Sequence, residues 1–170
     1  MSGALARWNG LPAEEAAEDI LACGGSKAWA KEMAERRPIA DETMLLTASD
    51  RVWATLSEAD WLEAFRSHPR IGESAGREAA SARSAHWSGE EQRGLYLAAD
   101  EIRSALAEGN RRYEERFRRI FIVCATGKSP VEMLEILQRR LRNDEQTELR
   151  EAAEQQRQIT QLRLKKWLHS

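Results

Sequence analysis

The 170-residue sequence has little of what cross-links a fold or anchors it in a membrane. Its two cysteines, Cys23 and Cys124, make no disulfide framework, and the apolar run around Cys124 favours a buried thiol in a reducing compartment. No apolar run approaches about 18 residues, so no membrane-spanning helix is predicted. Residues 1–8 hold no long apolar stretch, so no secretory signal is predicted and the cytoplasm is the expected location.

An excess of positive charge is also missing. The chain has 26 lysines and arginines against 28 acidic residues, a net charge of -2, which argues against a nucleic-acid binder. Its three histidines, His68, His86 and His169, do not have metal-ligand spacing and no Cys-x-x-Cys pair is present, so no metal site is predicted. No repeat, low-complexity segment or proline-rich linker divides the chain, and its length predicts one domain, residues 1–170.

What the chain does contain is helical periodicity with recognisable caps. In the first half, four helices are predicted. The first covers residues 12–23, and the second is capped by Ser26 and must stop before Pro38. The third is capped by Asp41 and carries the stripe Leu45, Ala48, Val52 and Leu56, and the fourth is short and is opened by Ser57 and Asp60. Residues 73–86 are small and polar and are expected to form a loop or a weak helix.

The second half repeats this pattern. It predicts a long helix from Ser88 through Leu106, a separate helix over 110–117, one capped by Ser129 with Pro130 in its first turn, and a last helix from about Asp144 to Trp167. The apolar run 121–125 fits either a buried strand-like piece or the end of a helix. Because no convincing strand pair is present, the expected fold is all-α, a single compact multi-helix domain.

The segment around His68 breaks the helical pattern. Pro69 pushes His68 out of helical geometry, and Gly72 permits a turn. A histidine can exchange a proton near neutral pH, and a loop between helices can aim it into a cleft. The same residues also fit a surface loop without chemistry, and the local pattern leaves both interpretations open.

Two further signals have a structural and a functional interpretation. Ser88 and Glu91 fit a capping box, which needs no function, although a helix N-terminus also suits an anionic ligand. Arg163 lies on the core-facing stripe of the last helix, with Leu149, Ala152, Gln156, Ile159 and Trp167. A buried arginine needs an anionic partner, which is either an acidic side chain or the carboxylate or carbonyl of a substrate.

In this order and spacing, the motifs resemble one family. They are residues 65–72 around His68, Ser88 with Glu91 and Gln92, Asn110, Tyr113, Phe117, residues 121–125, 139–143, Glu148 with Leu149, and 159–164. Together they resemble the OHCU decarboxylases, named for 2-oxo-4-hydroxy-4-carboxy-5-ureidoimidazoline, an unstable product of urate oxidation and ring hydrolysis. The similarity runs from about Trp8 to Leu168.

The resemblance implies an all-helical, cofactor-free and usually dimeric enzyme of urate degradation that acts on a small ureide, releases CO2 and yields (S)-allantoin. It implies that His68 is the catalytic acid or base. The substrate contacts that it implies are Pro69, Ser88, Gly89, Glu90, Glu91, Gln92, Phe121, Ile122, Val123, Cys124, Ala125 and Arg163, with Phe121 to Ala125 acting largely through backbone.

One departure from the family pattern stands out. Family members usually carry Phe-Gly-Phe or a close variant where this chain has Phe117, Arg118 and Arg119, so the path into residues 121–125 is expected to differ. A different class of function is the alternative: a helical protein-interaction module without chemistry. That alternative predicts a broad exposed face, whereas the enzyme predicts that His68, Glu91 and Arg163 converge on one cavity.

Overall fold

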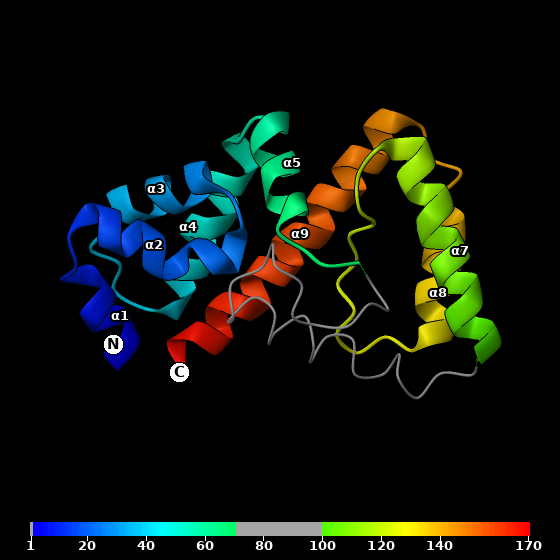
Figure 1. Cartoon of the computed structure of the whole chain (residues 1–170). Coiled ribbons are helices and arrows are strands. Elements are labelled where there is room, and N and C mark those ends of the chain that lie inside the picture. Colours follow the sequence, from blue (N-terminus) through cyan, green and yellow to red (C-terminus); the bar gives the residue numbers. More distant parts are fainter. Residues whose placement is uncertain (1, 71–99) are drawn as a thin grey trace. The chain divides into compact units, whose positions relative to one another are not determined.

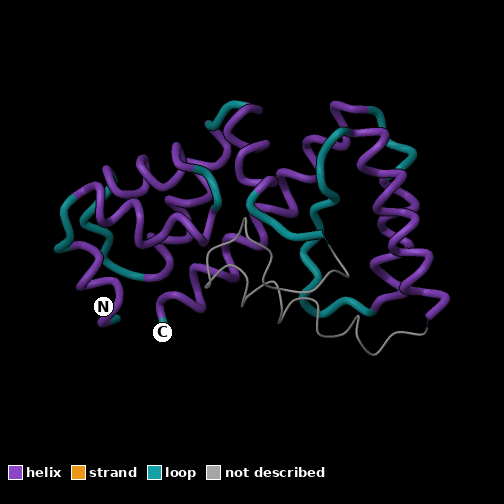
Figure 2. The backbone as a smooth tube through the Cα atoms, viewed as in Figure 1, coloured by secondary structure: helices purple, strands orange, loops and turns teal. Residues whose placement is uncertain are grey.

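A computed structural model describes residues 2–70 and 100–170 of the chain (Figure 1). Within these ranges every regular element is a helix, as the purple segments of Figure 2 show, and no strand is present. The expected all-α class is therefore confirmed. The described residues contain no helix that is long and apolar enough to cross a membrane.

The chain divides into two compact units. Unit 1 consists of residues 1–64 and 157–170, and unit 2 consists of residues 65–156. Unit 1 holds α1 (Gly3–Asn9), α2 (Ala13–Gly24), α3 (Lys27–Glu35), α4 (Glu42–Thr55), most of α5 (Glu58–Arg66) and the C-terminal part of α9 (Glu145–Leu168). Unit 2 holds α7 (Asp100–Phe117), α8 (Pro130–Arg140) and the N-terminal part of α9.

The helices of unit 1 begin and end largely where the sequence predicts. Gly25 ends α2 in the left-handed conformation with φ 75°, and the Ser26 hydroxyl accepts the N–H of Trp29 at the start of α3. Asp41 caps α4 in the same way through Met44 N–H at 2.8 Å. Ser57 and Asp60 exchange the two hydrogen bonds of a capping box before α5.

Unit 1 differs from the sequence-based expectations at two places. Helix α1 is not predicted by the sequence pattern, yet it forms with Ser2 as its N-cap and packs Trp8 into the core. In α4 the predicted stripe is only partly right, because Ser49 and Trp53 are buried while Ala48 is half-buried. The Nε1–H of Trp29 donates to the Ser49 hydroxyl at 3.2 Å, which explains why a polar residue replaces an apolar one in the core.

In unit 2, α7 and α8 pack side by side (Figure 1). The prediction of a separate helix over 110–117 is wrong, because α7 runs unbroken through Gly109. A Cβ atom at Gly109 would lie 2.5 Å from the Leu137 side chain, so this glycine lets the two helices approach rather than interrupting α7. The core here consists of Leu106, Tyr113, Phe117, Phe121, Val123, Ala125, Met133 and Leu137.

Helices α8 and α9 follow their sequence signals closely. Ser129 and Glu132 form the predicted capping box of α8, with Pro130 in the first turn. Asp144 accepts the N–H of Thr147 at 2.8 Å and caps α9. All six residues of the predicted α9 stripe are buried: Leu149, Ala152, Gln156, Ile159, Arg163 and Trp167.

Candidate active site

His68 lies on a turn just beyond the end of α5. Its backbone N–H donates to the carbonyl of Phe65 at 3.2 Å, and its side chain is buried, with 9% of the residue exposed. Pro69, half-buried, follows and disfavours helical geometry at His68, so the chain leaves the helix here as predicted. The burial argues against an exposed surface loop, the other interpretation of this motif.

The imidazole of His68 meets a glutamine of α9. Its Nε2 atom lies 2.6 Å from Oε1 of Gln156, whose own side chain is fully buried. The two residues are 88 positions apart in the sequence, so only the fold of unit 2 brings them together. A histidine with one nitrogen held by a buried partner has a fixed ring orientation, which acid–base chemistry requires.

A second contact fixes the turn on its other side. Nε of Arg70 donates to Oε1 of Glu114 on α7 at 2.5 Å, and both side chains are partly exposed. Exposed ion pairs of this kind typically contribute about 1 kcal/mol or less. The turn that carries His68 is therefore joined to α7 through Arg70 and to α9 through Gln156.

Residues 121–125 form a buried irregular segment. Its five residues are between 2% and 6% exposed, and Cys124 is not part of a disulfide. The prediction of burial is confirmed, but the segment is not the end of a helix, because α7 ends at Phe117. No regular ladder satisfies its backbone within the part of the chain that the structure describes, so other groups must do so.

Side chains from α8, from α9 and from the turn that directly follows residue 125 hold this backbone. Nη1 of Arg140 donates to the carbonyl of Ile122 at 2.5 Å, and the N–H of Cys124 donates to Oε1 of Gln155 at 2.8 Å. Nζ of Lys128 donates to the carbonyl of Cys124 at 2.6 Å. Buried backbone groups are costly without partners, so these three side chains fix the shape of the segment.

The arginine that holds Ile122 belongs to a buried charged network. Arg140 and Glu148 are 1% and 0% exposed, and Nε of Arg140 lies 2.9 Å from Oε1 of Glu148. The hydroxyl of Tyr113 donates to the same carboxylate at 2.5 Å, and Nδ2 of Asn143 donates to it at 3.0 Å. Several hydrogen bonds thus offset the desolvation of this ion pair.

The network also reaches the aromatic side chains of unit 2. The Arg140 guanidinium lies 4.6 Å from the centroid of the Phe121 ring, a cation–π distance. Burial raises the pKa of Tyr113 above its ordinary value; the Arg140 charge opposes this shift, and the Glu148 carboxylate adds to it. Tyr113 therefore keeps its proton and remains a hydrogen-bond donor to Glu148.

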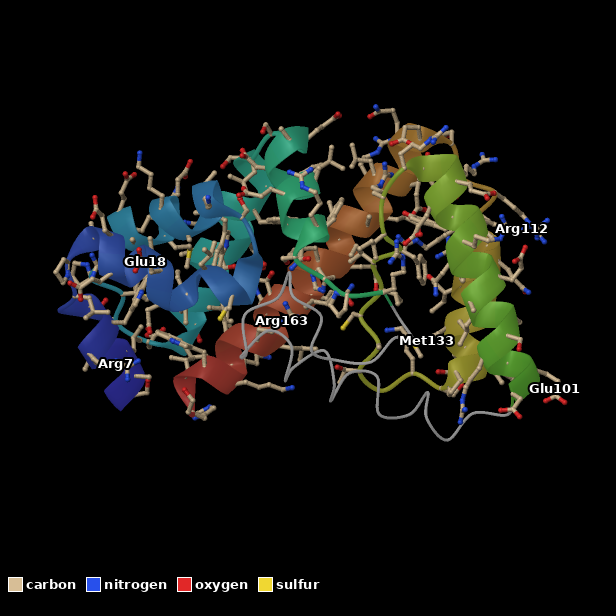
Figure 3. The ribbon with its side chains drawn as sticks, in the orientation of Figure 1. Arg7, Glu18, Glu101, Arg112, Met133 and Arg163 are labelled. Atoms are coloured by element: carbon tan, nitrogen blue, oxygen red, sulfur yellow. The ribbon has the colours of Figure 1, made fainter. Side chains whose placement is uncertain are left out.

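The remaining predicted site residues have different outcomes. Ser88, Gly89, Glu90, Glu91 and Gln92 lie outside the described residues. Arg163 is on the C-terminal part of α9, labelled in Figure 3, and is 1% exposed, so the predicted inward orientation is confirmed. Arg163 belongs to unit 1 and His68 to unit 2, and their convergence on one cavity stays a prediction.

The comparison with known proteins decides the family. A family model described as OHCU decarboxylase matches residues 9–165, which include most of both units. The chain belongs to the OHCU decarboxylase family. The resemblance of its motifs to this family is thereby confirmed.

Individual relatives and a solved structure agree with this assignment. The chain is 35% identical over 144 residues to the uric acid degradation bifunctional protein TTL of Arabidopsis thaliana, covering 85% of this chain and 44% of the relative. It is 28% identical over 155 residues to the uric acid degradation bifunctional protein of Bacillus sp. (strain TB-90), covering 88% of this chain and 30% of the relative. It thus spans less than half the length of either curated relative.

The fold matches a member of the family crystallised with a small ureide. A crystal structure of OHCU decarboxylase in the presence of (S)-allantoin superposes with a TM-score of 0.76 at 30% identity, and the match covers 90% of this chain and 99% of that one. The similarity therefore extends over nearly the full length of that protein.

At the departure from the family pattern, the backbone keeps a conformation that favours glycine. Arg118 ends α7 with φ 59°, in the left-handed region that favours glycine, and its N–H donates to the carbonyl of Glu114. The chain thus keeps a glycine-type conformation where family members usually carry glycine. The neighbouring Arg119 side chain is 8% exposed, pairs with Glu145 and lies 5.5 Å from the Phe117 ring, so it is largely buried.

Sequence patterns missed most of the residues that organise this site. Arg140 lies in the motif 139–143 but had no predicted role, and Gln155 occupies a helix position that looks ordinary in the sequence; each holds a backbone group of residues 121–125. Gln156 was expected on the buried stripe but without a role. A polar residue at a core-facing position is the signal that could have singled it out, because a buried amide needs a partner.

Proposed function

We propose that this chain decarboxylates 2-oxo-4-hydroxy-4-carboxy-5-ureidoimidazoline to (S)-allantoin and CO2, as part of urate degradation. The observation that carries the proposal is the buried His68, oriented by Gln156 at 2.6 Å, in a chain of the OHCU decarboxylase family. An oriented imidazole is what stereospecific proton transfer requires.

The substrate carries its own electron sink. When the bond between the ring carbon and the carboxylate breaks, the electron pair moves into the neighbouring C=N bond of the imidazoline ring. The enzyme then has to orient the carboxylate, handle the hydroxyl proton and deliver a proton to one face of the ring. No metal or organic cofactor is needed for these tasks, so we propose a cofactor-independent carboxy-lyase.

Each candidate residue has a proposed task. His68 exchanges the proton, with Pro69 beside it in contact with substrate, and Glu91 and Gln92 hold the hydroxyl, ring and ureido groups. Arg163 anchors a substrate oxygen, since a buried guanidinium favours an anionic partner. The backbone of residues 121–125 forms one wall, supported by the side chains that fix it.

Two broader expectations belong to the same proposal. We expect a homodimer in the cytoplasm, because the resemblance implies dimers and the apolar run around Cys124 favours a buried thiol in a reducing compartment. The non-catalytic interaction module gains no support from the family match.

The direct test uses freshly generated product of urate oxidation and ring hydrolysis. Adding the protein should accelerate CO2 release over the spontaneous reaction and yield (S)-allantoin, which circular dichroism distinguishes from the racemate. Prior dialysis against a chelator should leave the rate unchanged. A rate equal to the spontaneous one with racemic product would exclude the activity, and recovery of lost activity by zinc or manganese would exclude cofactor independence.

A further inference from the structure

Two consecutive glutamines of α9 contact the two described parts of the candidate site. Oε1 of Gln155 accepts the N–H of Cys124 at 2.8 Å, and Oε1 of Gln156 lies 2.6 Å from Nε2 of His68. Neighbouring positions on one helix have a fixed spacing. Gln155 and Gln156 therefore set the distance between the His68 ring and the 121–125 segment within unit 2. This arrangement gives Gln156 a role that packing alone does not require.

The contact at Nε2 determines where the proton of His68 sits. A glutamine carbonyl oxygen only accepts hydrogen bonds, so at 2.6 Å the Nε2 atom must carry the hydrogen. A neutral imidazole has one N–H, and Nδ1 is then the unprotonated nitrogen. The nitrogen that takes up or releases a proton during the reaction is therefore Nδ1.

We propose that Gln156 is a positioning residue that holds His68 in its Nε2–H tautomer and so makes Nδ1 the proton-exchanging atom; this rests on the proposed function of His68. When Nδ1 takes a proton, the imidazolium still donates from Nε2 to the same amide oxygen. When Nδ1 gives the proton up, the neutral ring returns to the same tautomer. The ring therefore keeps its hydrogen bond to Gln156, and with it its orientation, through the cycle.

A neutral amide suits this task better than a carboxylate would. An aspartate or glutamate at the same place would stabilise the imidazolium by its charge and oppose release of the proton. Gln156 is fully buried, so its side chain is held by the packing of α9. Leucine at this position keeps a similar volume but cannot accept a hydrogen bond, which makes Gln156→Leu the informative substitution.

Nitrogen NMR of the histidine rings tests the assignment in the free enzyme. The neutral form of His68, identified by the signal lost in His68→Asn, should show a protonated Nε2 and an unprotonated Nδ1. Gln156→Leu should produce a mixture of His68 tautomers. Gln155→Leu is the matched control at the preceding residue, and it should leave the His68 tautomer unchanged. A protonated Nδ1 in the wild-type protein would overturn the proposal.

Kinetics provides the second readout. Since general acid–base catalysis contributes about 10²–10⁴-fold, loss of ring orientation in Gln156→Leu should lower kcat at least about tenfold with little change in KM. A folded Gln156→Leu protein with unchanged kcat would contradict a positioning role. If that variant does not fold, Gln156→Glu replaces it, because glutamate retains an acceptor oxygen and should keep His68 in the Nε2–H tautomer. Loss of that tautomer in Gln156→Glu would equally overturn the proposal.

The two readouts separate this inference from the proposed function. A wild-type protein with the Nε2–H tautomer but no accelerated decarboxylation would exclude the proposed reaction while leaving the hydrogen-bond assignment intact. An active wild-type protein with a protonated Nδ1 would support the reaction and exclude the role of Gln156.

Discussion

The two units of the chain bury polar groups in different ways. Unit 1 is built from helices, and fully buried hydrogen bonds in its core join neutral groups, such as Trp8 Nε1–H to the carbonyl of Ala16 at 2.7 Å. Unit 2 contains the buried irregular segment 121–125. A buried ion pair, Arg140–Glu148, holds this segment through the hydrogen bond from Arg140 to Ile122. Buried charge thus appears where backbone must be fixed outside regular structure.

Arg163 stands out against this pattern. Among the described residues of unit 1 it is the one buried charged side chain. Unit 2 uses its buried arginine for architecture, whereas we propose that unit 1 uses its own for ligand binding.

The largest expected effect comes from removing the buried arginine of unit 2. Arg140→Met leaves Glu148 as an uncompensated buried charge and Ile122 without its donor, so the free energy of unfolding should fall by about 3–5 kcal/mol. Arg139→Met is the matched control, because Arg139 pairs with Glu151 at the surface. This substitution should lower the free energy of unfolding by about 1 kcal/mol or less. Urea unfolding measures both, and equal losses would contradict the comparison.

A smaller effect is expected from the hydroxyl that donates to Glu148. Tyr113→Phe should cost about 1–3 kcal/mol near neutral pH, because a buried carboxylate loses a donor. Since burial raises the pKa of Tyr113, the folded state holds this proton more tightly than the unfolded state. The associated stability is present below pH about 10, the ordinary tyrosine pKa, and is lost as pH rises above it.

The free energy of unfolding, measured across that alkaline range, checks whether stability falls with rising pH as expected. The wild-type protein should lose stability more steeply with rising pH than Tyr113→Phe does. Parallel curves for the two proteins would show that Tyr113 titrates alike in the folded and unfolded states.

The smallest effect concerns the backbone just before the 121–125 segment. Arg118→Gly should raise the free energy of unfolding by about 0.5–1 kcal/mol, because φ 59° strains an arginine and glycine adopts it freely. Gly127→Ala is the mirror control: Gly127 has φ 77° with open space around it, so alanine there should be destabilising by about 1 kcal/mol. A destabilised Arg118→Gly would show that the arginine side chain outweighs the strain.

Local signals in the sequence predict much of this fold and less of the site. Caps such as Ser129 with Glu132 fix helix starts because each acts over three residues, and the α9 stripe follows from helical spacing. The contact between His68 and Gln156 joins positions 88 residues apart, and the bond from Cys124 to Gln155 joins positions 31 apart. Such pairings depend on how helices pack, which no local pattern encodes.

The continuity of α7 illustrates the same limit. Gly109 in the sequence looks like an interruption, and only the proximity of Leu137 shows that the missing Cβ serves packing instead. The local break at Pro69 and the family resemblance both indicated His68, and the resemblance indicated the 121–125 segment. The residues that hold them, Gln156 and Arg140, became visible through their contacts.

The central claim is that His68 exchanges the proton in a decarboxylation, and His68→Asn tests it most directly. The rate of CO2 release above the spontaneous background should disappear in this variant, while the protein stays folded with a stability loss of about 1–3 kcal/mol from the lost buried hydrogen bond to Gln156. A folded His68→Asn protein that releases CO2 and yields (S)-allantoin within a few-fold of the wild-type rate would contradict the account.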